Sequence, residues 1–109
     1  MKTATRDRIV EAARRLFWER GYAATGVAQI LKAAGAKSGS LYYFFPTKED
    51  LLLAVLEWYK HNLWPQVVQP VFERVQDPIE RIFGILDGYR RHLEAAKYTY
   101  GCPIGNLAL

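Results

Sequence analysis

A tight turn from Gly35 to Gly39 constrains this chain more than any other feature, because it joins two short segments that both have helical apolar spacing. The first segment runs from Thr25 to Ala34, and we expect Thr25 to be its N-cap residue. The second runs from Ser38 to Phe45 and is closed by Pro46. Two helices joined by so short a turn form a helix-turn-helix. The residues expected to face inward are Val27, Ile30, Leu31, Ala34, Leu41 and Phe45.

A longer helix is predicted before this pair, beginning near Thr5. Gly21 ends it as a C-cap residue, and Tyr22 is expected to pack back on Phe17. Its apolar face consists of Ile9, Ala12, Ala13, Leu16 and Phe17. Residues 1–47 are therefore predicted to form a three-helix domain.

Residues 48–109 are predicted to be helical as well, so the whole chain is expected to be all-α. Thr47 and Asp50 have the spacing of a capping box and open a fourth helix, which Pro65 and Pro70 are expected to break or restart. Asp77-Pro78-Ile79-Glu80 has the signature of a further helix start. Residues 98–103 are expected to be a loop, and residues 104–109 the beginning of a helix. The apolar residues of the fourth helix are Leu51, Leu52, Val55, Leu56, Tyr59 and Leu63.

The helix that begins at Asp77 carries a long apolar stripe and should reach Ala96. Few helices remain in the chain to cover this stripe, so we expect it to promote association. The stripe consists of Ile79, Ile82, Phe83, Leu86, Tyr89 and Leu93.

The charge of the chain is unevenly placed, although its formal net value is only +4. Residues 1–48 hold nine Lys and Arg against three acidic residues, a net charge of +6, whereas residues 49–109 have a net charge of −2. A basic N-terminal half indicates binding to a polyanion such as nucleic acid. A solvated helix face that happens to be basic remains the alternative.

The segment from Lys37 to Tyr43 has the composition needed to enter the major groove of DNA. Gly39 lets the backbone approach base edges, while Lys37, Ser38 and Ser40 supply hydrogen-bond donors. Tyr42 and Tyr43 offer hydroxyl groups to phosphates and rings to thymine methyl groups. Thr25 and Lys48 are placed to hold flanking phosphates. The alternative is that the Tyr-Tyr-Phe-Phe run is core, in a helical interaction module that binds no DNA.

Residues 9–52 resemble the tetracycline-repressor (TetR) family of transcriptional regulators, over about 40% of the chain. The matching residues are Ala12-Ala13, Leu16-Phe17, Gly21-Tyr22, Ala33-Ala34-Gly35, Gly39-Ser40-Leu41-Tyr42-Tyr43, Phe45 and Lys48-Glu49-Asp50-Leu51.

This resemblance implies a homodimeric DNA-binding regulator of the repressor type, with base contacts from Lys37, Ser38, Gly39 and Tyr43. It assigns phosphate contacts to Thr25, Tyr42 and Lys48. It also implies that residues 48–109 are the first part of a domain that dimerises and binds a small-molecule inducer. Members are usually much longer, so the chain is expected to be the N-terminal part of a longer protein.

Four aromatic residues of the second half are candidates for lining an effector pocket. They are Trp58, Tyr59, Trp64 and Tyr89. The same residues suit an ordinary core, or a surface that further helices cover.

Other function classes find little support in the sequence. His61 and His92 lie on different predicted helices without ligands at metal spacing, so no metal site or cofactor is expected, and no catalytic constellation indicates an enzyme. The single Cys102 favours a cytoplasmic protein and, with Lys97 as its closest basic neighbour, inert packing over redox sensing. Uncharged stretches reach about a dozen residues, short of the roughly 18 that a membrane span needs.

Overall fold

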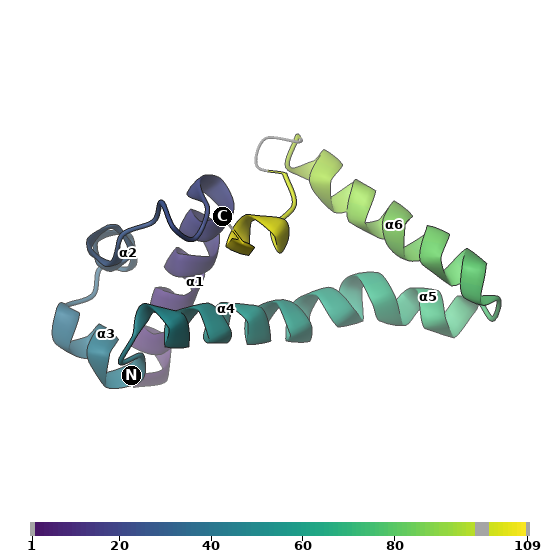
Figure 1. The fold of residues 1–109 in the computed structure, drawn as a ribbon. Coiled ribbons are helices and arrows are strands. Elements are labelled where there is room, and N and C mark those ends of the chain that lie inside the picture. The colour runs from purple at the N-terminus through teal and green to yellow at the C-terminus, as the bar shows by residue number, and fades with distance from the viewer. Residues whose placement is uncertain (1, 98–100, 109) are drawn as a thin grey trace. The chain divides into compact units, whose positions relative to one another are not determined.

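The computed structural model describes residues 2–97 and 101–108, and every regular element among them is a helix (Figure 1). The all-α prediction is therefore confirmed. The chain forms two compact units: unit 1 comprises Met1–Leu56 and Cys102–Leu109, and unit 2 comprises Glu57–Gly101. The expected functional boundary after residue 47 stays a prediction. Within the described residues, no helix combines the length and hydrophobicity needed to cross a membrane.

Helix α1 (Lys2–Arg20) supplies most of the core of unit 1 and begins three residues before the predicted start at Thr5. Ile9, Ala13 and Phe17 are completely buried, and Ala12 and Leu16 are nearly so, which confirms the predicted apolar face. Full burial of a side chain such as Ile9 or Phe17 contributes about 1.5–3 kcal/mol to folding.

The turn after α1 is built as the sequence predicts. The Gly21 amide donates to the Phe17 carbonyl oxygen at 2.8 Å, and Gly21 adopts φ 86°, a left-handed conformation that favours glycine. The Tyr22 ring then packs edge-on against Phe17, with 5.2 Å between ring centroids.

Helix α2 (Val27–Ala34) is capped by Gly26, so the prediction that Thr25 is its N-cap is wrong. The reason is burial: Thr25 is 1% exposed, and its hydroxyl points at the carbonyl oxygens of Gly21 (2.8 Å) and Leu16 (3.2 Å). The Gln29 side chain instead accepts a hydrogen bond from the Gly26 amide at 3.0 Å.

The inward face of α2 is largely as expected. Ile30 and Ala34 are buried, while Val27 and Leu31 are half-buried. Gly35 ends the helix with φ 62°, as predicted for a C-cap glycine.

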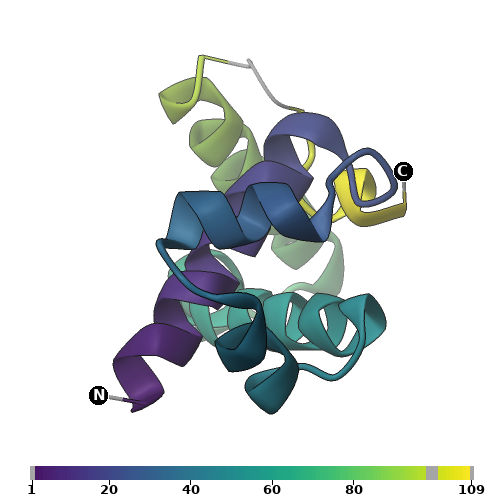
Figure 2. The same cartoon turned by 90° about the vertical axis from the view of Figure 1, so that its left-hand side faces the viewer.

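Helices α3 (Ser38–Phe44) and α4 (Lys48–Leu63) follow within unit 1, α4 continuing beyond it. Both α2 and α3 contact α1, which fixes the helix-turn-helix pair on a common support (Figure 2). The predicted capping box of α4 is present. The Thr47 amide donates to the Asp50 carboxylate at 3.0 Å, and the Asp50 amide donates to the Thr47 hydroxyl at 3.1 Å.

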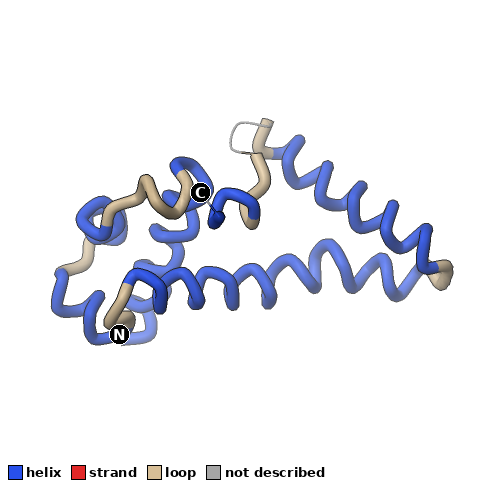
Figure 3. Tube along the Cα trace, in the orientation of Figure 1, coloured by secondary structure: helices blue, strands red, loops and turns tan. Residues whose placement is uncertain are grey.

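A new helical segment starts at each proline of unit 2, so the restart predicted for Pro65 and Pro70 is confirmed and the break is not. The chain passes from α4 through a π-helical segment, η1 (Trp64–Val68), into α5 (Gln69–Arg74), and Figure 3 shows an uninterrupted helical path. The Gln69 amide donates to the carbonyl oxygen of Trp64, five residues earlier. Each proline lies in the first two positions of its segment, where its missing N–H group is tolerated.

Helix α6 (Pro78–Ala95) begins as predicted, because the Asp77 carboxylate accepts a hydrogen bond from the Glu80 amide at 2.9 Å. The helix packs on η1 and α5, with Gly84 and Gly88 at the contact. Most of the predicted stripe is uncovered in this chain: Ile79, Ile82, Phe83 and Leu86 are 58–67% exposed, and Tyr89 and Leu93 are half-buried.

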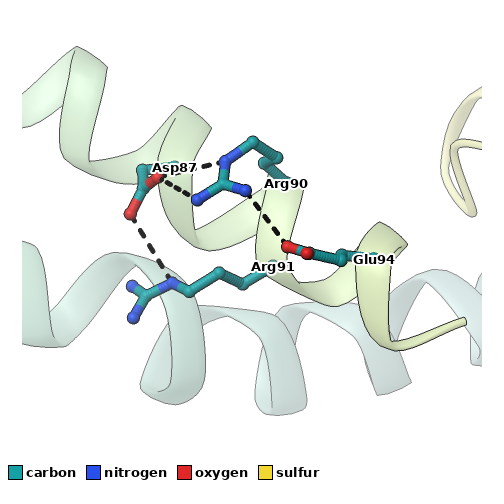
Figure 4. Close-up of polar contacts among 4 residues, drawn as sticks. All are labelled: Asp87, Arg90, Arg91 and Glu94. Atoms are coloured by element: carbon teal, nitrogen blue, oxygen red, sulfur yellow. Dashed lines mark hydrogen bonds and ion pairs between the residues drawn. The ribbon is translucent and has the colours of Figure 1, made fainter. Parts of the chain in front are cut away.

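The second half of α6 carries an exposed ion-pair network (Figure 4). Arg90 contacts Asp87 at 2.9 Å and Glu94 at 3.1 Å, and Arg91 contacts Asp87 at 3.6 Å. The Arg90 guanidinium, which hydrogen-bonds to the Asp87 carboxylate, lowers the pKa of Asp87 below its ordinary value of 3.8.

The chain returns to unit 1 after Gly101. A short 3-10 helix, η2 (Gly105–Ala108), replaces the helix start expected at residues 104–109, and it contacts α1. The predicted loop at residues 98–103 falls partly outside the described residues, which resume at Gly101.

Candidate nucleic-acid interface

Helix α3 is anchored by one face and presents the other to solvent. Leu41 and Phe45 are buried at 3% and 4% exposure, as predicted for residues four apart. Tyr42 and Tyr43 are 55% and 67% exposed, so the Tyr-Tyr-Phe-Phe run is only partly core. The exposed face therefore offers two aromatic hydroxyl groups to a binding partner.

The first turn of α3 is open to close approach. Lys37, Ser38 and Gly39 are exposed, and Ser40 is half-buried. A β-carbon built on Gly39 would meet no heavy atom of the protein within 4 Å. The backbone at Gly39 is thus accessible to another molecule, and a side chain added there would project outward instead of disturbing the core.

Lys48 lies at the start of α4 and is tied to the turn after α1. Its ammonium group donates to the Tyr22 carbonyl oxygen at 2.7 Å and lies 4.3 Å from the centroid of the Tyr22 ring. An ammonium group has three donors, so this contact orients Lys48 while leaving capacity for a further acceptor. Sequence reasoning selected Lys48 but missed Tyr22 as its partner, because no local spacing links residues 26 apart.

Thr25 differs from the other predicted site residues. Its hydroxyl is buried and directed at two carbonyl oxygens of unit 1, as described above. This geometry gives the predicted phosphate contact no support, and Thr25 instead holds the α1–α2 turn to the end of α1.

The net positive charge of the chain comes from unit 1. Unit 1 contains nine basic and five acidic residues, a net charge of +4, whereas unit 2 contains six of each. Some of these charges are paired within α1: Arg14 contacts Glu11, and Arg6 lies 3.9 Å from Asp7. The excess of positive charge remains, and it favours association of unit 1 with a polyanion.

The predicted effector residues lie in unit 2 with different exposures. Tyr59 is buried and Trp58 half-buried, their rings meeting edge-on at 5.3 Å. Trp64 is 52% exposed, and its ring centroid lies 5.8 Å from that of Phe72. Tyr89 is half-buried. An open depression in this unit is lined by Lys60, His61, Trp64 and Pro65, so it includes one of the four predicted residues.

Comparison with protein families identifies the helix-turn-helix region. Residues 9–55 match the family described as "Bacterial regulatory proteins, tetR family". This segment includes α2, α3 and the first half of α4.

Two curated relatives from Bacillus subtilis match nearly the whole chain. The HTH-type transcriptional regulator LmrA is 37% identical over 105 residues, which cover 95% of this chain and 55% of LmrA. The uncharacterized HTH-type transcriptional regulator YxaF is 34% identical over 104 residues, which cover 95% of this chain and 54% of YxaF. The chain therefore spans about half the length of these relatives.

A solved structure shares this fold. The crystal structure of the regulatory protein TetR from Rhodobacter sphaeroides superimposes with a TM-score of 0.78 at 28% sequence identity. The match covers 95% of this chain and 55% of the other.

Proposed function

This chain belongs to the TetR family of bacterial regulatory proteins, and we propose that it binds duplex DNA through α3 as part of a transcriptional repressor. The observation that carries the proposal is the two-sided character of α3. Leu41 and Phe45 anchor the helix, while Ser38, Gly39 and the two tyrosines remain exposed. A relative named HTH-type transcriptional repressor ComR, from Escherichia coli, is 45% identical over 58 residues, which supports the repressor assignment.

In this proposal the beginning of α3 reads bases in the major groove. Lys37, Ser38 and Ser40 donate hydrogen bonds to base edges, and the bare backbone at Gly39 permits the close approach. The exposed ring of Tyr43 contacts a thymine methyl group.

Phosphate contacts come from residues beside this segment. The Tyr42 hydroxyl and the Lys48 ammonium group each bind the DNA backbone, which positions α3 without reading sequence. Thr25 has no part in this proposal because its hydroxyl is buried.

The regulator acts as a homodimer that responds to a small molecule. Two recognition helices must lie about 34 Å apart to read successive half-sites on one face of DNA, and a dimer provides this spacing. The aromatic residues Trp58, Tyr59, Trp64 and Tyr89 belong to the effector-binding part, where an apolar or aromatic inducer would shift DNA affinity by about 1–3 kcal/mol.

Selection from a random-sequence pool of duplexes tests this function directly. We expect the chain to enrich one palindromic sequence, and its affinity for that duplex to fall steeply between about 50 and 200 mM salt. A helical interaction module without DNA binding would enrich no sequence and show no such salt dependence. That result would reject the proposal.

A further inference from the structure

The segment Cys102–Leu107 closes onto the turn after α1, and this contact joins residues that are far apart in the chain. The Asn106 side-chain amide donates to the main-chain carbonyl oxygen of Trp18 at 2.6 Å. The main-chain amide of Tyr22 donates to the main-chain carbonyl oxygen of Asn106 at 3.2 Å. Leu107, next in sequence, is buried. Asn106 thus forms hydrogen bonds with Trp18 and Tyr22, which lie on either side of Gly21, the residue directly after α1.

The segment also has internal bonds that hold its shape. The Asn106 amide donates to the Cys102 carbonyl oxygen at 3.0 Å, and the Gly105 amide donates to the Cys102 sulfur at 3.3 Å. We call residues 102–107 the clip. Because its turn is bonded within itself, moving Asn106 off α1 requires the clip to move as a body.

Tyr22 receives a second contact, from Lys48 at the start of α4. Its amide bonds to Asn106, whereas its carbonyl oxygen and ring hold the ammonium group of Lys48. All three residues belong to unit 1. The two covalent connections between the units, at Leu56–Glu57 and at Gly101–Cys102, therefore lead to residues that bond to Tyr22: Lys48 on α4 and Asn106 in the clip.

We propose that the clip positions Lys48 for its phosphate contact by fixing Tyr22, so that Asn106 is a positioning residue for DNA binding. The DNA-binding part of this inference rests on the function proposed above; the link from Asn106 to Lys48 does not. An extended lysine side chain has many rotamers, and a fixed carbonyl oxygen and ring select one of them. When the hydrogen bonds of Asn106 are lost, Tyr22 can move, and a single rotamer of Lys48 is no longer favoured.

The first test uses no DNA and compares Asn106→Asp with the parent chain. The variant keeps the size of the side chain but sets a carboxylate against the Trp18 carbonyl oxygen. We expect hydrogen exchange at the Tyr22 amide to accelerate about tenfold, as in local opening. We also expect acetylation of Lys48 by acetic anhydride to rise relative to that of exposed Lys37 in the same sample. If Lys48 reactivity stays unchanged relative to Lys37, the proposed link from the clip to Lys48 is wrong.

Asn62→Asp is a matched control. The Asn62 side-chain amide donates to the Trp58 carbonyl oxygen at 2.7 Å, so the same change removes a comparable bond in unit 2. We expect it to leave hydrogen exchange at Tyr22 and acetylation of Lys48 at parental values. A rise equal to that in Asn106→Asp would show that the effect on Lys48 does not depend on the clip. If Asn106→Asp does not fold, Asn106→Ser removes the amide without adding charge and is measured by the same two readouts.

The second test measures affinity for a mixed-sequence duplex at low salt. Asn106→Ser, which leaves the net charge unchanged, should weaken binding between about twofold and tenfold, the range that one lost hydrogen bond usually corresponds to. In a Lys48→Ala background the same substitution should have no further effect, because its target is already absent. If the two substitutions instead lower the affinity by independent factors that multiply in the double variant, the clip stabilises unit 1 without positioning Lys48. If the parent binds no DNA while the first test succeeds, the proposed function fails and the link between the clip and Lys48 stands.

Discussion

Gly84 of α6 lies so close to Val71 of α5 that a β-carbon at Gly84 would stand 2.9 Å from one Val71 methyl carbon and 3.1 Å from the other. Val71 is buried, and its branched side chain has few alternative rotamers. One turn further along α6, a β-carbon at Gly88 would stand 3.1 Å from Val67. The two glycines therefore allow α6 to cross η1 and α5 at short range.

Gly84→Ala should destabilise unit 2. Alanine gains up to about 1 kcal/mol over glycine in a helix, but the added methyl overlaps both Val71 methyl groups, and overpacking costs about 1–3 kcal/mol. We expect a net loss, measured as a lower midpoint of thermal or urea unfolding. Val71→Ala in the same chain should recover part of the loss by making room. An unchanged midpoint for Gly84→Ala would mean that the overlap with Val71 costs no more than the helix propensity that alanine adds.

Gly39→Val should abolish sequence-specific DNA binding while the fold survives. A β-carbon at this position would meet no atom of another element, and the branched side chain would stand between α3 and the groove floor. Circular dichroism melting checks the fold, and titration with the selected duplex checks binding. Normal operator affinity in a variant that melts like the parent would place Gly39 away from the groove.

Lys48→Ala should weaken specific and non-specific DNA binding alike. One phosphate contact is lost, so the slope of log affinity against log salt should fall by about one unit. Fluorescence anisotropy with selected and scrambled duplexes at several salt concentrations measures both slopes. A slope equal to that of the parent would show that Lys48 does not contact a phosphate.

The exposed apolar face of α6 should drive association of this chain. Ile79, Ile82, Phe83 and Leu86 fall on one side of the helix, and covering apolar surface stabilises by about 25 cal/mol per Å². We expect sedimentation to show concentration-dependent association that Phe83→Lys reduces. Leu53→Lys is the matched control, since Leu53 is equally a large exposed residue but lies in unit 1. A parent chain that stays monomeric at high concentration contradicts this expectation.

The network around Asp87 should make a small, pH-dependent contribution to α6. Because the pKa of Asp87 is lowered in the folded state, its stabilisation is present above the ordinary value of 3.8 and is lost as the pH falls through the lower folded value. Asp87→Asn should therefore melt below the parent at neutral pH, and the difference should shrink as the pH falls below 3.8 through the lowered pKa of the folded state. A difference that persists unchanged into acid would assign the effect to something other than the carboxylate charge.

The sequence by itself determined the elements whose signals are local. The capping box of Thr47 and Asp50, the Asp77 cap and the glycine stops at Gly21 and Gly35 all depend on hydrogen bonds or backbone conformations within a few residues, and each was predicted correctly. Apolar spacing likewise identified the buried faces of α1 and α3, because helical periodicity places those residues on one side.

Only the tertiary structure decided the features that depend on distant contacts. Thr25 has the residue type of an N-cap, but carbonyl oxygens at the end of α1 bind its hydroxyl and leave the cap to Gly26. The prolines of unit 2 left a break and a restart open locally, and a π-helical turn at Pro65 keeps the path helical. The bond from Asn106 to Trp18 spans 88 residues, and no periodicity, motif or charge pattern encodes a contact of that separation.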